Sequence, residues 1–262
     1  MTGNDNGLTL ALWQAETVAG DRERAFAQIG RAARAAGLAG ADAIVFPELF
    51  LTGYEREDLS DLALGEAEMA ERLAPLAREA GCAICVGYPE RREEGIANSA
   101  LCISGGGALL ANHRKIQLYG ETEARRFQPG DAYTIFELAG RKAAILICYD
   151  IEFAPHVAAL RAHGVEVILV PTAAMRPFEH VGVHVVPAMA ANHRLAIVYA
   201  NLCGREAHLE FFGGSTIAGP DGQVLAQAGA LPCLLLATLK PRYDPALLST
   251  QDRDLRQIGK GM

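Results

Sequence analysis

Short apolar runs alternate along the chain with longer stretches of helical periodicity. Runs of four to eight apolar and β-branched residues are typical of buried strands, whereas apolar residues three and four positions apart are typical of amphipathic helices. In the first half, strands are predicted at residues 8–13, 43–46, 83–87, 98–103 and 108–112, and helices at 22–36 and 64–80. The opening half therefore mixes the two kinds of element.

The second half continues the pattern with more strands in series. Strands are predicted at residues 135–138, 143–148, 167–170, 196–201, 215–218, 223–226 and 233–238, and helices at 155–163 and 183–194. Pro171 is expected to close the strand before it, and Pro187 either kinks the last helix or marks its first turn.

No linker or repeat divides the chain, so we expect a single domain over residues 1–262. About a dozen strands are too many for one short flat sheet. The pattern favours an α/β fold of two packed sheets with helices outside.

Composition and charge exclude several classes of protein. Half of the residues are hydrophobic, and 24 basic against 31 acidic residues give a net charge of −7 without a basic block. We therefore expect no nucleic-acid partner. No run reaches membrane-spanning length and the first seven residues do not resemble a signal peptide, so we expect no membrane partner and a cytoplasmic location with six reduced cysteines.

Chemistry-bearing side chains follow three of the predicted strands. Glu48 comes after an apolar strand and a stiffening proline, Lys115 follows another strand, and Cys148 ends the run 143–148. Strand ends are where catalytic groups collect in α/β proteins. Each residue alone has a structural interpretation: Glu48 as a solvated strand cap, Lys115 as a surface lysine and Cys148 as core filler. Together they indicate a general base, an oxyanion-stabilising cation and a nucleophile.

These three segments resemble the motifs of the nitrilase superfamily of carbon-nitrogen hydrolases, whose triad is Glu, Lys and Cys. The matching stretches are Phe46-Pro47-Glu48, His113-Arg114-Lys115-Ile116 and Ile147-Cys148-Tyr149-Asp150, with further similarity at residues 127–130, 199–204 and 213–222. The resemblance implies a four-layer α-β-β-α sandwich of two mixed sheets, a homodimer formed by stacked helix faces, and a second glutamate. That glutamate falls on Glu123, and Glu121 is a rival.

The resemblance implies a mechanism that uses no metal and no organic cofactor. Glu48 takes the proton of Cys148, the thiolate attacks an amide carbon, and Lys115 with the backbone N–H of Tyr149 stabilises the oxyanion. Ammonia leaves, and water cleaves the resulting thioester.

Residues beside the triad favour a small, neutral aliphatic amide as substrate. In this superfamily nitrile hydrolases usually carry Cys-Trp-Glu, whereas here Tyr149 and Asp150 follow the cysteine. Carbamoyl-amino-acid hydrolases place arginines just beyond, where this chain has Ile151 and Glu152. By the strand-end argument, Tyr54, Thr172 and Ala173 are expected on loops that line the pocket. Arg176 is a possible anion binder or a surface arginine.

Other functions stay open at this point. An N-carbamoyl amide hydrolase or a nitrile hydrolase would share the fold, and a non-catalytic binding protein could retain it. The pairs Cys82 with Cys85 and His180 with His184 suggest a metal site, but neither has a second pair close by in the sequence. We therefore expect no metal.

Overall fold

The computed structural model describes the backbone of residues 7–256 and their side chains except that of Asp252. Residues 1–6, which belong to the stretch expected not to be a signal peptide, lie outside the described residues. Among the described residues, no helix is long and apolar enough to cross a membrane.

Two six-stranded sheets and one small hairpin account for the strands. The first sheet has the order β14-β1-β2-β3-β4-β5, with β1 Leu8–Gln14, β2 Ala43–Val45, β3 Ala83–Arg92, β4 Gly95–Ile103, β5 Leu109–Arg114 and β14 Cys233–Leu239. The second has the order β13-β12-β9-β8-β7-β6, with β6 Ile135–Leu138, β7 Arg141–Ile145, β8 Val167–Thr172, β9 Ala196–Asn201, β12 Thr216–Ala218 and β13 Val224–Gln227. The hairpin pairs β10 Cys203–Glu206 with β11 Leu209–Phe212.

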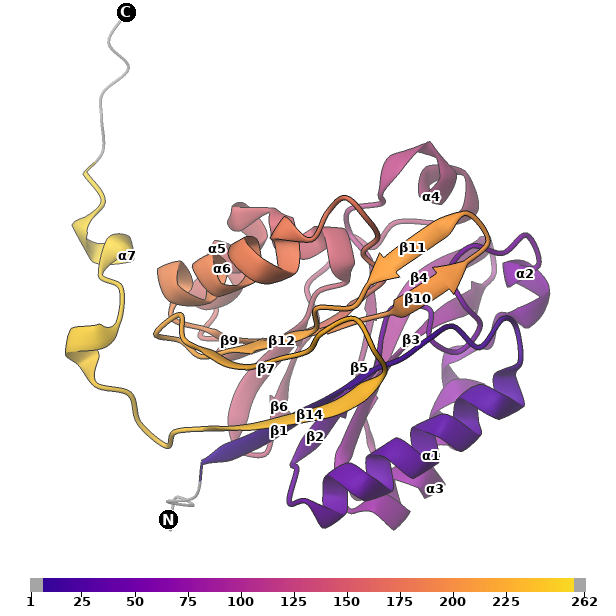
Figure 1. Cartoon of the computed structure of the whole chain (residues 1–262), viewed down its shortest axis with the longest axis horizontal. Helices are drawn as coiled ribbons and strands as arrows, with labels where there is room; N and C mark the ends of the chain where they lie inside the picture. Colours follow the sequence, from indigo (N-terminus) through magenta and orange to yellow (C-terminus); the bar gives the residue numbers. More distant parts are fainter. Residues whose placement is uncertain (1–6, 257–262) are drawn as a thin grey trace, which may run out of the picture.

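Four helices lie on the outer faces of the sheets, α1 Arg22–Leu38 and α3 Glu66–Ala80 on the first sheet and α5 Ala154–Ala162 and α6 Val186–His193 on the second (Figure 1). The shorter helices are α2 Leu59–Leu62, α4 Gly120–Arg126 and α7 Gln251–Asp254. Short 3-10 turns span Cys148–Glu152 and Pro245–Leu247, and a π-helical turn spans Val181–Val185.

Three apolar cores hold the layers together. One packs α1 and α3 on the first sheet, a second fills the space between the sheets, and a third packs α5 and α6 on the second sheet. In each sheet the central strands pair in parallel, as in β1 with β2 and β8 with β9. The outer strands pair antiparallel, as in β1 with β14 and β6 with β7. The expected α-β-β-α sandwich of two mixed sheets is confirmed.

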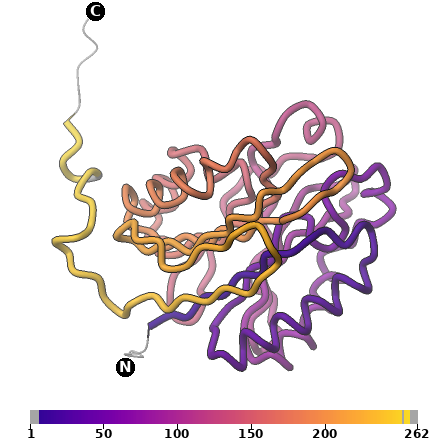
Figure 2. Tube along the Cα trace, in the orientation of Figure 1, coloured from indigo at the N-terminus to yellow at the C-terminus, as the bar shows by residue number. Residues whose placement is uncertain are grey.

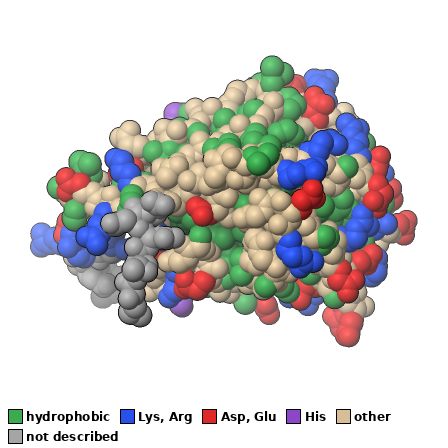
Figure 3. All heavy atoms as spheres, turned by 90° about the horizontal axis from the view of Figure 1, so that it is seen from below, with side chains coloured by type: hydrophobic (Ala, Val, Ile, Leu, Met, Phe, Trp, Pro, Cys, Tyr) green, Lys and Arg blue, Asp and Glu red, His purple; other side chains and the backbone are tan. Residues whose placement is uncertain are grey.

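Strand β14 returns from the second sheet to pair with β1, so strands from the two ends of the chain are neighbours (Figure 2). From there the chain runs to α7, where the Gln251 amide donates to the side-chain oxygen of Asn192 on α6 at 2.9 Å. On the face in Figure 3, basic side chains lie among acidic ones.

The structure corrects the predicted ends of several elements. Strand β8 continues through Pro171 to Thr172, although Pro171 was expected to close it. The pairing of β7 with β8 stops at Leu169, so at Pro171 only β9 pairs with β8. A proline is tolerated there because it has no N–H to donate and no strand pairs with it on the β7 side. The helix expected at 183–194 is a π-helical turn followed by α6, with Pro187 in the first turn of α6.

Candidate active site

Glu48, Lys115 and Cys148 lie where strands of the two facing sheets end. Glu48 follows β2 by three residues and Lys115 directly follows β5, while Cys148 begins the 3-10 turn after β7. The strand run expected at 143–148 therefore ends three residues before the thiol. The backbone N–H of Glu48 donates to the carbonyl oxygen of Thr172 at 3.3 Å, which joins the two sheets beside the site.

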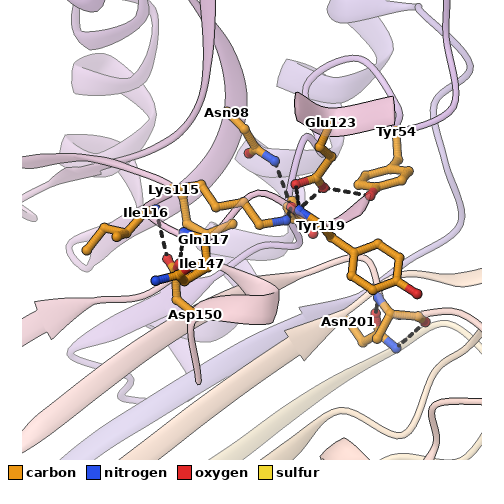
Figure 4. Close-up of polar contacts among 12 residues, drawn as sticks. Tyr54, Asn98, Lys115, Ile116, Gln117, Tyr119, Glu123, Ile147, Asp150 and Asn201 are labelled. Atoms are coloured by element: carbon orange, nitrogen blue, oxygen red, sulfur yellow. Dashed lines mark hydrogen bonds and ion pairs between the residues drawn. The ribbon is translucent and has the colours of Figure 1, made fainter. Parts of the chain in front are cut away.

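Lys115 is buried between two carboxylates. Its ammonium group donates to Glu48 Oε1 and to Glu123 Oε1, each at 2.7 Å. Burial alone would lower the pKa of Lys115, but the charges of Glu48 and Glu123 outweigh it and raise that pKa. The lysine is therefore held in its charged form. Figure 4 shows its side chain extending toward Glu123.

The two carboxylate oxygens of Glu48 differ: one accepts hydrogen bonds, and the other is open, meaning that it has no hydrogen-bond partner within the described residues. Asn98 donates its side-chain amide to Glu48 Oε1 at 2.7 Å, beside Lys115, whereas the buried Oε2 has no hydrogen-bond partner within the described residues. Burial raises the pKa of Glu48, opposed by Lys115 and assisted by Glu123. A carboxylate with raised pKa and an open oxygen is suited to accept a proton.

Glu123 is anchored at the start of α4. Its Oε1 also accepts the Tyr54 hydroxyl at 2.6 Å, and its Oε2 accepts the backbone N–H of Tyr119 at 2.7 Å. The rival Glu121 extends from the same helix with its side chain 92% exposed, paired to Arg125. Glu123 is therefore the glutamate that reaches the lysine, and Glu121 is not part of the cluster.

Cys148 has a left-handed backbone conformation, with φ of 47°. This conformation is uncommon for residues with a side chain and costs about 1–3 kcal/mol, so its surroundings must hold it in place. Burial and the charge of Glu48 raise the pKa of the thiol, while Lys115 and groups at Thr172 and Ala173 lower it. The net pKa is well above the ordinary value, so the resting group is a thiol that needs a base.

Asp150 ties the cysteine turn to the lysine loop. Its carboxylate accepts the backbone N–H of Ile147 at 2.9 Å and that of Gln117 at 2.7 Å (Figure 4). Asp150 is fully buried, and these two N–H groups come from elements that follow different sheets. The carboxylate thereby links the segment after Lys115 to the segment before Cys148.

A pocket of about 250 Å³ opens onto the thiol. It is lined by residues of several loops: Tyr54, Tyr119, Cys148, Tyr149, Glu152, Ala173, Ala174, Met175, Phe178, His180 and Val181. Tyr54, Tyr149 and Ala173 were expected there. The loop position expected for Thr172 is wrong, because Thr172 ends β8 and is fully buried.

Residues outside the predicted set support the pocket and the Glu48 cluster through hydrogen bonds. The side chain of Asn201 bonds both backbone groups of Ala174, at 2.8 and 3.1 Å, and so holds that loop. Glu206 accepts the backbone N–H of Tyr54 at 2.8 Å. Asn98, which bonds Glu48, lies within β4, and a polar residue in an otherwise apolar run is the sequence feature that could have revealed it.

Arg176, considered above as an anion binder or a surface arginine, is half exposed and forms ion pairs with Glu210 at 2.9 Å and with Glu179.

The pairs Cys82 with Cys85 and His180 with His184 were considered above as metal ligands. Among residues 7–256, there is no group of three or more His, Cys, Asp or Glu side chains arranged to hold a metal ion. Cys82 and Cys85 are buried, at the start of β3, and His180 and His184 flank the first part of the π-helical turn.

Comparison with known sequences matches most of the chain to one family. A family model described as carbon-nitrogen hydrolase matches residues 9–243. A Pseudomonas protegens protein described as a hydrolase in the pqqF 5′ region is 42% identical over 204 residues, covering 76% of this chain and 72% of the relative. An (R)-stereoselective amidase from a Pseudomonas species is 32% identical over 200 residues, covering 72% of this chain and 69% of the amidase.

Solved structures agree with the sequence match. A variant of the amidase of the nitrilase superfamily from Nesterenkonia AN1 superposes with a TM-score of 0.85 at 32% identity, covering 91% of this chain and 93% of the amidase. Variants of that amidase are known in complex with acrylamide and with butyramide, and with the acetamide moiety of fluoroacetamide added covalently at the active-site cysteine. With the matched family model, this likeness shows that the chain belongs to the carbon-nitrogen hydrolases of the nitrilase superfamily.

Proposed function

We propose that the protein is an amidase that hydrolyses a small aliphatic amide to a carboxylic acid and ammonia through a thioester on Cys148. The observation that carries the proposal is the buried Lys115 between Glu48 and Glu123, beside a thiol that opens onto a pocket of about 250 Å³. This volume suits a ligand of few heavy atoms.

In the proposed first half-reaction, Sγ of Cys148 gives its proton to the open Oε2 of Glu48 as it attacks the amide carbon. The charge that develops on the amide oxygen is stabilised by Lys115 and by the backbone N–H of Tyr149. The carbon-nitrogen bond then breaks, and the proton held by Glu48 passes to the leaving nitrogen, which departs as ammonia.

In the second half-reaction, water attacks the thioester and gives a proton to Glu48. The carbon-sulfur bond breaks, the acid leaves, and the proton returns to the sulfur. Because Glu123 is fixed by Tyr54 and Lys115, we assign it the role of positioning the substrate amide or this water.

The amides bound by the Nesterenkonia amidase support this substrate class, since variants of that protein form complexes with acrylamide and butyramide. The alternatives are hydrolysis of nitriles or N-carbamoyl amides at the same cysteine. No arginine is among the pocket-lining residues that the structure describes, so a carbamoyl amino acid would lack a bidentate partner for its carboxylate.

The test is ammonia release from short amides by wild type, Cys148→Ala and the matched control Cys233→Ala. Wild type and Cys233→Ala should release ammonia from amides faster than from nitriles or carbamoyl amino acids, and Cys148→Ala should release none. Mass spectrometry of quenched wild type should show an acyl adduct on Cys148. Turnover by Cys148→Ala at the wild-type rate would exclude the thioester route.

The homodimer implied by the sequence resemblance remains part of this proposal. Light scattering on the purified protein tests it: a mass near twice the 27.9 kDa of the chain is expected, and a monomer mass at all concentrations would contradict it.

A further inference from the structure

One charged side chain of the pocket has no part in the proposed mechanism. Glu152 ends the 3-10 turn that Cys148 begins, lines the same pocket and is accessible to solvent. Within the described residues, the lining contains no lysine or arginine to neutralise it. Because Glu152 and Cys148 line the same pocket, the carboxylate faces the space next to the thiol without a lysine or arginine partner in the lining.

Several elements surround this carboxyl group. The charge of His180, which precedes the π-helical turn, and that of Lys115 both act on it, and its own charge acts on Tyr119. Burial raises the pKa of Glu152, while His180 and Lys115 lower it. Lys115 is already held by Glu48 and Glu123, so it does not form an ion pair with Glu152.

Three aromatic rings line the same pocket as Glu152. The ring of Tyr119 packs edge-on against that of Tyr149 at 5.3 Å and that of Phe178 at 5.9 Å, and all three line the pocket. Aromatic faces and a carboxylate together attract a cation, whereas a carboxylate on the substrate would be repelled.

We propose that Glu152 selects amides whose far end carries a primary ammonium group, bound between the carboxylate and the rings of Tyr119, Tyr149 and Phe178. This inference rests on the proposed function, since it names the substrate class of the same site. It also departs from our sequence-based expectation of a largely neutral amide.

The experiment compares three amides of similar size at pH 8: 5-aminopentanamide, hexanamide and glutaramic acid. At that pH the amine of 5-aminopentanamide is charged. The readout is the ratio of kcat/KM for 5-aminopentanamide to that for hexanamide, by ammonia release.

Wild type should favour 5-aminopentanamide over hexanamide by about fivefold or more, with glutaramic acid the poorest. In Glu152→Gln the ratio should fall by about three- to fivefold, and 0.5 M NaCl should lower the wild-type ratio because the carboxylate is accessible. Glu121→Gln, which removes an exposed charge outside the pocket, should keep the wild-type ratio.

Equal kcat/KM of wild type for the two amides, or an unchanged ratio in Glu152→Gln, overturns the inference. Hydrolysis of hexanamide in the same experiment upholds the proposed function. Absence of ammonia from all three amides and from butyramide overturns the proposed function, and the inference with it.

Discussion

The ends of the two sheets contribute to the site in opposite ways. The first sheet provides Glu48 and Lys115, which are buried and bonded to each other, to Asn98 and to Glu123. The second provides Cys148, which has a left-handed backbone and opens onto the pocket. The charges are thus fixed before a ligand arrives, which is the condition for effective electrostatic stabilisation, while the proposed nucleophile opens onto the pocket.

Asp150 and Thr172 connect these two regions. Asp150 bonds the backbone of both the lysine loop and the cysteine turn, and the Thr172 carbonyl accepts the N–H of Glu48. If the comparison is correct, loss of Lys115 from the buried cluster of Glu48, Lys115 and Glu123, here called the closed region, should abolish activity. Weakening the connection through Asp150 should lower activity, and neutralising one carboxylate of the closed region should shift its pH dependence.

The largest effect is expected from Lys115→Met. It leaves Glu48 and Glu123 buried together without a cation, and removing one partner of a buried ion pair costs about 3–5 kcal/mol. Loss of an oxyanion donor lowers kcat by roughly 10²–10³. Urea unfolding and ammonia release measure the two losses. The partly exposed Lys142→Met is the control, and an effect of similar size in both variants would contradict the special role of the closed region.

A smaller loss is expected from Asp150→Asn. The amide keeps the shape but replaces a carboxylate that accepts the backbone N–H groups of Ile116, Gln117 and Ile147, which lowers stability by about 1.5–3 kcal/mol. Because the spacing between Lys115 and Cys148 loosens, kcat should fall more than KM changes. Exposed Asp131→Asn is the control. An Asp150→Asn enzyme with unaltered kcat would show that the sheets are aligned without this bond.

Gly87→Ala tests the backbone under Glu48. A Cβ at Gly87 would lie 2.5 Å from the carbonyl oxygen of Pro47 and 2.6 Å from Glu48 Cα, so that loop must shift. Such overpacking costs about 1–3 kcal/mol, and kcat should drop with it. Gly106→Ala, whose Cβ meets only Ser104 Oγ at 3.8 Å, should behave like wild type in melting and ammonia assays. Equal behaviour of the two alanine variants would mean that the loop is not confined.

The mildest change is expected from Glu123→Gln, in the pH profile. Glu48 must be deprotonated to act as the base, so kcat/KM falls as the pH drops through its raised pKa, above the ordinary value of 4.5. The charge of Glu123 contributes to that rise, and its removal should move the acid limb to lower pH. The limb belongs to the coupled cluster as a whole. A shift to higher pH would contradict the assigned sign.

Apolar runs bounded by turn residues were predictable, and short segments without such a run were not. Strands β6 and β9 have the predicted ends, because their apolar runs are bounded by turn residues. Helix α4 and the hairpin of β10 and β11 were missed, because seven largely polar residues and two four-residue strands have too little apolar periodicity. Pro171 was wrongly expected to end β8, because the absence of a neighbouring strand on one side cannot be read locally.

The sequence by itself determined the residue types and their order: three chemistry-bearing side chains, each after an apolar strand, with the family motifs around them. Only the tertiary structure decided that Glu123 and not Glu121 meets Lys115, that Thr172 is buried in a strand, and that Glu152 faces the pocket. The physical reason is that strand ends are set by local patterns, whereas distances across two sheets and the burial of a charge arise from packing between segments far apart in the chain.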